Sequence, residues 1–248
     1  FEHDAITAIG DERGRPVASL DLEPELLSLV FGRQQEERMI IPLAEAPKVF
    51  VNAVLAAEDA RFYRHAGIDP LAVLRAAFTN VKSGRIVQGG STITQQTVKN
   101  LYFSQERTWW RKIREALMSV ILDSRYSKDR ILEVYLNAVY LGQRGSVSIC
   151  GVQAASRYFF GRNVSDLSLA EAATLAGLIR NPGGYNPFTH PDRAVERRNA
   201  VLDAMVDLGL ADKAAVARAK ADPLRVASGG AGYAQAPYVV DFVRAQLA

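Results

Sequence analysis

The order of apolar and polar residues along the chain predicts a short lead-in followed by a series of helices. Residues 1–45 contain short alternating stretches and few helix signals, so we expect extended segments there. From Pro47 to about Phe62, apolar side chains recur at helical spacing without an internal glycine or proline, which predicts a helix with Glu58 on or near its end. The whole pattern predicts a mainly α fold, with minor β structure at the N-terminal end.

Two further helices are expected between residues 69 and 102. The first has a stripe of apolar side chains along one face, and the second has a stripe of polar side chains. Asp69 and Pro70 form an N-cap and first-turn pair for a helix that Gly84 ends. Its apolar stripe consists of Leu71, Leu74, Phe78 and Val81. Ser91 is expected to cap the next helix, which runs to about Tyr102. That helix has a polar stripe, made of Thr92, Gln95, Gln96 and Lys99.

The second half of the chain continues with helices of increasing apolar content. The helix that contains Glu115 has an apolar stripe that we expect to face the core, and Glu115 lies just beside this stripe. The stripe consists of Ile113, Ala116, Leu117, Val120 and Ile121. Ser168 and Glu171 form a capping box before a nearly all-apolar helix that ends at Arg180. A helix that is apolar on all sides is expected to be central and buried. The last helices are expected at 192–208 and 211–222.

Composition limits the class of protein without choosing its function. The 248 residues are 48% hydrophobic, enough for one domain with sub-lobes around a shared core. The net charge of +3 is too weak to indicate nucleic-acid binding, but it suits a phosphate-bearing substrate or an anionic membrane surface. The single cysteine, Cys150, excludes an internal disulfide and a cysteine-based metal site, and we expect it to be buried. Because the chain starts at Phe1 without a long apolar run, we expect a fragment whose membrane anchor lies upstream.

Two glutamates stand in segments that suit glycosidic chemistry. Glu58 begins the stretch EDARFYRHAGID, and Glu115 ends the cluster RKIRE. Glycosyl chemistry uses one carboxylate as a base or acid and a second acid to support the transition state. Apolar neighbours can raise the pKa of such a carboxylate toward the working pH. The structural alternative is that Glu58 caps a turn and that Glu115 pairs with Arg111 on a solvated helix face.

The polar neighbours of these glutamates have two interpretations each. Asp59, Arg61 and His65 crowd around Glu58, although His65 also fits a structural, hydrogen-bonding histidine. The cations of interest are Lys99, Arg111, Lys112 and Arg180. They are either solvated surface charges or donors to a sugar diphosphate leaving group. A hydrolase of neutral glycans has no need for such donors, so a phosphate role would favour a transferase.

The absence of several motifs argues against other kinds of site, and one aromatic segment indicates a possible surface for lipid. The sequence has no His/Asp/Glu pair with metal-ligand spacing, no nucleotide-binding glycine motif and no Ser-x-x-Lys. An aromatic segment flanks the connector SQERT, and its residues are Leu101, Tyr102, Phe103, Trp109 and Trp110. This segment is either an interfacial patch that dips into a bilayer or part of the core.

Four motifs, EDARFYRHAGID, GGSTITQQTVKN, RKIREA and KDRILEVYLNAVYLG, occur in this order and spacing. Over roughly residues 45–205 the chain thereby resembles the peptidoglycan glycosyltransferase family of class A penicillin-binding proteins and monofunctional transglycosylases. The phrases RYSKDRILEVYLN, YFFGRNVSDLSLAEAA and ERRNAVLDAM are most similar to the penicillin-binding protein 1b type. The chain departs from that pattern at Arg180, where relatives usually have lysine, and in the less polar GSVSICG at 145–151.

The resemblance implies a lysozyme-like head lobe with a smaller, membrane-associated jaw lobe that carries the aromatic segment. It implies polymerisation of lipid II into β-1,4-linked glycan strands, with inversion and release of undecaprenyl diphosphate. Glu58 would be the general base on the acceptor 4-hydroxyl, and Glu115 would assist on the donor side. The diphosphate would be held by Lys99, Arg111 and Lys112. The groups that position sugar and backbone would be Asp59, Thr92, Gln95 and Gln96.

The resemblance also sets expectations for organisation and surroundings. The glycosyltransferase domain would span 46–222, and 223–248 would be a linker toward a transpeptidase domain that this chain lacks. The protein would act at the bacterial inner membrane, with the catalytic domain on the periplasmic face. Its partners would be lipid II, the growing strand, membrane lipids and other cell-wall synthesis proteins, with no nucleic acid and no required cofactor, although Mg²⁺ or Mn²⁺ is possible. The rival functions are a lytic, lysozyme-like hydrolase and a non-enzymatic wall-binding module.

Overall fold

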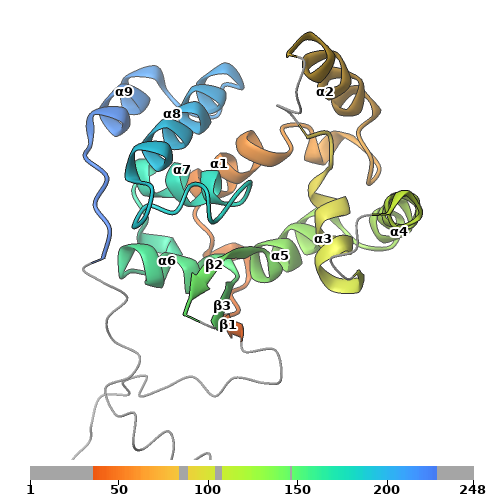
Figure 1. Cartoon of the computed structure of the whole chain (residues 1–248), viewed down its shortest axis with the longest axis horizontal. Helices are drawn as coiled ribbons and strands as arrows, with labels where there is room; N and C mark the ends of the chain where they lie inside the picture. The colour runs from red at the N-terminus through yellow and green to blue at the C-terminus, as the bar shows by residue number, and fades with distance from the viewer. Residues whose placement is uncertain (1–35, 84–88, 104–107, 146, 228–248) are drawn as a thin grey trace, which may run out of the picture. The chain divides into compact units, whose positions relative to one another are not determined.

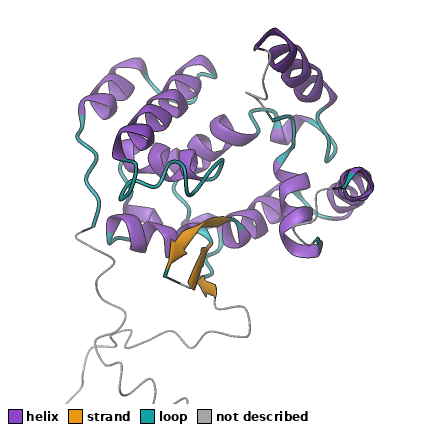
Figure 2. Ribbon diagram, in the orientation of Figure 1, coloured by secondary structure: helices purple, strands orange, loops and turns teal. Residues whose placement is uncertain are grey.

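The computed structural model describes residues 36–83, 89–103, 108–145 and 147–227, all of which lie within the unit Phe31–Gly230. These residues form helices joined by short connections, with one small sheet (Figure 2). The helices are α1 (Lys48–Glu58), α2 (Pro70–Ser83), α3 (Ile93–Tyr102), α4 (Trp109–Arg125), α5 (Lys128–Ala138), α6 (Val152–Phe160), α7 (Leu169–Leu178), α8 (Pro191–Asp207) and α9 (Lys213–Ala221). The strands are β1 (Glu36–Arg38), β2 (Tyr140–Arg144) and β3 (Val147–Cys150). The prediction of a mainly α fold is confirmed, whereas most of the predicted lead-in lies outside the described residues.

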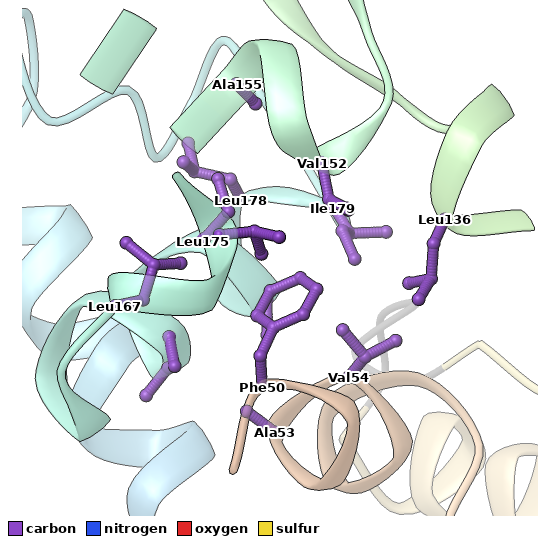
Figure 3. Close-up of a cluster of buried hydrophobic side chains, with 14 of the residues drawn as sticks. Phe50, Ala53, Val54, Leu136, Val152, Ala155, Leu167, Leu175, Leu178 and Ile179 are labelled. Carbon is purple, nitrogen blue, oxygen red and sulfur yellow. The ribbon is translucent and has the colours of Figure 1, made fainter. Parts of the chain in front are cut away.

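The core is built around α7, which packs against α1, α6, α8 and α9 (Figure 1). Ser168 and Glu171 form the expected capping box at its start, and nearly every residue of the helix is buried. Phe50 of α1 points into the middle of this cluster, toward Leu175 and Leu178 of α7 (Figure 3). The prediction that this apolar helix is central and buried is therefore confirmed.

β1 of the sheet lies in the N-terminal segment for which minor β structure was predicted, whereas β2 and β3 were not predicted. β3 lies in the middle, parallel to β1 and antiparallel to β2. Cys150 at the end of β3 is buried, as expected, and burial raises the pKa of its thiol. Gly151 follows with φ +84°, and a Cβ at this position would lie 2.9 Å from the carbonyl oxygen of Asn137. Glycine is required here because the backbone has positive φ and approaches α5 closely.

The helices α2 and α4 have the predicted amphipathic patterns, but their apolar stripes point toward solvent. The exposed apolar side chains are Leu71, Leu74, Phe78 and Val81 of α2 and Trp109, Trp110, Ile113, Leu117, Val120 and Ile121 of α4. The prediction that the stripe of α4 faces the core is wrong, because Glu115 and Ser119 are the buried residues instead. The backbone of Gly67 lies so close to α4 that a Cβ there would be 2.4 Å from the carbonyl oxygen of Ser119. The inner face of α4 thus meets polar backbone and side chains, which its own polar residues can satisfy.

Most predicted helix limits agree with the structure to within a few residues. Asp69 caps α2, as expected, because its Oδ1 accepts from the backbone N–H of Leu71 at 3.1 Å. The helix α3 is capped by Thr92 and not by the predicted Ser91. Gly84, the expected end of α2, lies outside the described residues. Helix α6 is a further element that the sequence pattern did not predict.

Candidate active site

Glu58 is the last residue of α1, and a chain of hydrogen bonds fixes its carboxylate. The next residue, Asp59, leaves the helical conformation with φ −158° and ψ 79°. Gln96 of α3 donates from Nε2 to Glu58 Oε2 at 2.9 Å. The buried Tyr135 of α5 donates from its hydroxyl to Gln96 Oε1 at 3.1 Å. Three helices therefore determine the direction of the Glu58 side chain.

The surroundings of Glu58 raise its pKa above the ordinary value of a glutamate. Burial of the carboxyl group is the largest cause, and the negative charge of Asp59 adds to it. The hydrogen bond from Gln96 and the positive charges of Arg197 and Arg180 act in the opposite direction but do not cancel the effect of burial. A carboxylate with a raised pKa is a stronger base, which suits proton abstraction.

Asp59 and His65 are buried behind Glu58 and bond to each other. Asp59 Oδ2 lies 2.9 Å from His65 Nε2 and also accepts from the backbone N–H of Ile93 at 3.0 Å. The carbonyl oxygen of His65 accepts from Lys128 Nζ at 2.6 Å. These contacts attach the EDARFYRHAGID segment to α3 and α5. The predicted contact of Asp59 and His65 with substrate stays a prediction.

Thr92 and Gln95 fix the start of α3. The Thr92 side chain accepts from the Gln95 N–H at 3.1 Å, and the Gln95 side chain accepts from the Thr92 N–H at 3.0 Å. The Thr92 hydroxyl also donates to the carbonyl oxygen of Gly67 at 2.6 Å. This capping box places Gln96, one residue later, against Glu58. Both Thr92 and Gln95 are buried, and their predicted contact with substrate is not tested.

Glu115 is the centre of a second cluster, on the inner face of α4. Arg111 donates from Nη1 to Glu115 Oε2 at 2.9 Å, and Lys112 donates from Nζ to Oε1 at 2.5 Å. Lys112 also donates to the hydroxyl of Ser91 at 2.8 Å. The pairing of Glu115 with Arg111 that the structural alternative predicted is therefore confirmed, but its solvated setting is wrong, because the side chain of Glu115 is only 2% exposed. We call Ser91, Arg111, Lys112 and Glu115 the cation clamp.

The two clusters are connected through α3, and their chemistry differs. Ser91, just before the N-cap of α3, contacts the cation clamp, whereas Gln96 contacts Glu58. The Glu58 cluster is a desolvated carboxylate with neutral hydrogen-bonding partners. The cation clamp holds two positive charges around one negative charge, an arrangement suited to an anionic group.

The cation clamp does not fit a metal centre built by the protein. In the described ranges no group of three or more His, Cys, Asp or Glu side chains is placed to hold a metal ion. Each carboxylate oxygen of Glu115 already accepts from a cationic side chain. A hard divalent cation needs several oxygen ligands, which these side chains do not supply.

Two of the predicted cations, Lys99 and Arg180, are not among the residues of the clamp. Lys99 is exposed near the end of α3, three residues beyond Gln96. Arg180 follows α7 and is exposed, and its charge lowers the pKa of Glu58. The structure therefore groups Arg180 with Glu58 and not with Arg111 and Lys112.

The aromatic segment is accessible at its two described ends. Trp109 and Trp110 are 87% and 72% exposed, and Leu101 and Tyr102 are exposed as well. Phe103 is partly buried. Exposure of both tryptophans makes the core-packing alternative wrong for them and is compatible with contact to a bilayer.

Sequence reasoning missed several residues of the site. Ser91 was interpreted as a cap, Tyr135 as part of the apolar stripe of a helix that Ser127 opens, and Lys128 only as part of a motif. Arg197 was not singled out, although it lies in the ERRNAVLDAM phrase. Helical spacing did not predict the contacts of Ser91 with Lys112, of Lys128 with His65 or of Tyr135 with Gln96, because each joins residues more than twenty positions apart.

Comparison with known proteins agrees with the motifs. The family model described as Transglycosylase matches residues 25–206. Penicillin-binding protein 1B of Haemophilus influenzae is 45% identical over 208 residues, which cover 84% of this chain and 26% of that protein. Penicillin-binding protein 1B of Escherichia coli is 42% identical over 241 residues, which cover 97% of this chain and 29% of that protein. The crystal structure of penicillin-binding protein 1A from Haemophilus influenzae aligns with a TM-score of 0.48 at 24% identity, over 86% of this chain and 21% of that one.

The chain thus spans between a quarter and a third of the length of these two curated relatives. The family match covers most of the residues that form both clusters and the core around α7. On this match and these identities, the chain belongs to the transglycosylase family, the peptidoglycan glycosyltransferase family that its sequence motifs resemble.

Proposed function

We propose that the chain polymerises lipid II into β-1,4-linked glycan strands by inverting glycosyl transfer. The observation that carries the proposal is the contrast between its two glutamates. Glu58 is a carboxylate whose pKa is raised by burial, whereas both oxygens of Glu115 are engaged by cations. Two acidic groups in environments this different are suited to two different roles in one reaction.

In the proposed reaction Glu58 is the general base. Its carboxylate takes the proton of the acceptor 4-hydroxyl as that oxygen attacks the anomeric carbon of the lipid-linked donor. The bond between the anomeric carbon and the diphosphate oxygen breaks, and its electron pair leaves with undecaprenyl diphosphate. Attack from the side opposite the leaving group inverts the configuration.

The cation clamp is the proposed site for the leaving group. Negative charge develops on the diphosphate during bond cleavage, and preorganised cations stabilise it. Arg111 and Lys112 are held in place by Glu115, so little reorganisation is needed. The buried Nε of Arg111 has no hydrogen-bond partner within the described ranges, which leaves a donor for a phosphate oxygen. Lys99 is proposed to contact the same anion.

The lipid part of the substrate is proposed to lie along the exposed faces of α2 and α4. These faces carry contiguous apolar stripes, whereas the inner face of α4 carries the cation clamp. Within the described ranges, no helix combines the length and hydropathy needed to cross a bilayer. We propose that the exposed apolar stripes contact the surface of a bilayer, at the periplasmic face of the bacterial inner membrane. Other cell-wall synthesis proteins are further proposed partners.

The proposal is tested by incubating fluorescently labelled lipid II with the protein and separating the glycan products on a gel. The wild-type chain should give a ladder of long strands, and Glu58→Gln should give none. Glu45→Gln is the matched control, because it makes the same change at an exposed position outside both clusters. Polymer at the wild-type yield from Glu58→Gln would contradict the mechanism.

The same gel separates the proposal from the rival hydrolase. A lytic enzyme should release short fragments from finished, labelled glycan strands and should make no ladder from lipid II. A non-enzymatic wall-binding module should do neither. The cation clamp favours the transferase, because a hydrolase of neutral glycans has no diphosphate to stabilise.

A further inference from the structure

Lys128, the first residue of α5, joins three parts of the chain around its ammonium group. Its Nζ donates to the carbonyl oxygen of His65 at 2.6 Å and to Oδ1 of Asp123 in α4. The same Nζ lies 4.7 Å from the centre of the Phe62 ring, which is within reach of a cation–π interaction. An ammonium has three N–H donors, and these three contacts engage all of them. Lys128 thus connects the segment after Glu58 with the helix that carries the cation clamp.

These contacts are shielded from water. The side chain of Lys128 is 19% exposed and that of Asp123 is 10% exposed, while Phe62 is fully buried. Partly buried ion pairs are screened much less by salt and water than pairs on the surface. The position of the ammonium is therefore well determined.

The contact of Lys128 with His65 continues to the residue that follows Glu58. Nε2 of His65 lies 2.9 Å from Oδ2 of Asp59, and both side chains are buried. The other ring nitrogen, Nδ1, has no hydrogen-bond partner among the described residues, so the hydrogen bond with Asp59 is the one that orients the ring. Lys128 holds the backbone of His65, and the His65 ring holds Asp59. The peptide bond from Asp59 leads directly to Glu58.

Helix α5 also reaches Glu58 by a second route. Tyr135 donates to Gln96, which in turn donates to the carboxylate of Glu58. Lys128 and Tyr135 are seven residues apart, about two helical turns, so they lie on the same face of α5. The route through Tyr135 fixes the direction of the carboxylate, and the route through Lys128 fixes the backbone that follows it. One face of one helix thus holds Glu58 at two points.

We propose that Lys128 is a positioning residue for glycosyl transfer, which fixes the chain after Glu58 so that its carboxylate meets the acceptor hydroxyl in reactive geometry. This inference rests on the proposed function of Glu58 as the general base. A base must lie within hydrogen-bond reach of the proton that it takes, and a displacement of about 1 Å can cost roughly a hundredfold in rate. Lys128 acts through His65 and Asp59, because its own donors are already engaged.

The test compares the turnover number of Lys128→Met with its dissociation constant for labelled lipid II. Methionine keeps an unbranched side chain but lacks the ammonium group. The turnover number for polymerisation should fall roughly tenfold to a hundredfold, because the base is displaced, whereas the dissociation constant should stay within about twofold. Lys128→Arg keeps the charge and the donors and should recover part of the lost rate. All rates are measured well below the melting temperature of each variant.

Lys220→Met is the matched control. Lys220 also donates to an aspartate of a neighbouring helix, Asp203 of α8, but neither residue belongs to the contacts around Glu58. This variant should keep the wild-type turnover number and dissociation constant. A lysine that only stabilises the fold would lower the melting temperature and leave the rate below it unchanged, so a wild-type turnover number in Lys128→Met would overturn the inference. A loss of activity that is explained entirely by weaker binding of lipid II would overturn it as well.

Asp123→Asn tests the same link if Lys128→Met does not fold. Asparagine has nearly the same shape as aspartate but no charge, so it holds the Lys128 ammonium less firmly. The turnover number should fall by a smaller factor, roughly threefold, with little change in the dissociation constant. An unchanged turnover number in this variant would overturn the inference.

Failure of this inference can be told apart from failure of the proposed function. If Glu58→Gln is inactive but Lys128→Met turns over at the wild-type rate, only the role of Lys128 is wrong. If Glu58→Gln still polymerises lipid II, the proposed function of Glu58 is wrong, and the role of Lys128 falls with it.

Discussion

The helices around α7 and the helices α2 and α4 use the same kind of amphipathic pattern in opposite ways. Around α7, apolar side chains such as Phe50 point inward and are fully buried. In α4, apolar side chains such as Leu117 are 62% exposed, and the charged Glu115 is buried. Periodicity identifies a helix and its stripe, but the partner surface decides which side of the helix is buried.

The two regions also give a buried carboxylate two different environments. Glu58 lies beside the apolar core, where burial dominates and raises its pKa. Glu115 lies on a polar inner face, where Arg111 and Lys112 supply the compensation that a buried charge needs. The first setting suits proton transfer, and the second suits binding of an anion.

The largest expected effect concerns the free energy of unfolding, which should differ between a substitution in the core around α7 and one on α2. Phe50→Ala should lower the free energy of unfolding by about 3–5 kcal/mol, because it opens a cavity in the core. Phe78→Ala on α2 removes the same atoms from a side chain that is 73% exposed and should change stability by about 0.5 kcal/mol or less. Urea titration followed by circular dichroism measures both values. Equal losses would show that α2 is packed as the core is.

A smaller effect is expected on binding to membranes. Trp109→Ser and Trp110→Ser should each weaken binding to anionic phospholipid vesicles by roughly tenfold, since burying a large apolar side chain contributes about 1.5–3 kcal/mol. Leu208→Ser is the control, because Leu208 is an exposed apolar residue just after α8. Vesicle co-sedimentation gives the affinities. A similar loss in the control would mean that the exposed face of α4 has no special role.

The smallest effect concerns the stability of the Glu58 variant. A carboxyl whose pKa is raised in the folded state contributes stability below its unfolded pKa, and this contribution is lost as pH rises through the folded value. Glu58→Gln cannot lose a proton, so its melting temperature should match the wild type in acid and exceed it increasingly toward neutral pH. Differential scanning calorimetry between pH 4 and 8 would measure the gap. A gap that closes as pH rises would contradict the raised pKa.

Most helices were predicted well from the sequence, because helix signals are local, whereas the roles of the two glutamates stay predictions. The capping box at Ser168 and the helical spacing before Glu58 are readable within a few residues. The orientation of α4 was predicted wrongly, because apolar spacing does not tell a core-facing stripe from an exposed one. Contacts such as Tyr135 with Gln96 join residues 39 positions apart, so no local pattern contains them.

The strands β2 and β3 were missed for a related reason. β2 and β3 have only five and four residues, and glycine interrupts the segment. The pairing of β3 with β1 joins chain segments about a hundred residues apart, which hydrophobic spacing does not connect. Short strands of this kind are determined by the surrounding fold more than by their own pattern.

The central claim is that the two glutamates have separate roles, one in proton transfer and one in holding the leaving group. It is tested most directly by the dissociation constant of labelled lipid II for Glu58→Gln and for Arg111→Gln. Glu58→Gln should bind lipid II with an affinity close to the wild type. Arg111→Gln should bind it roughly tenfold or more weakly, because a charge-assisted contact is lost. Equal loss of affinity in both variants would contradict the division of roles.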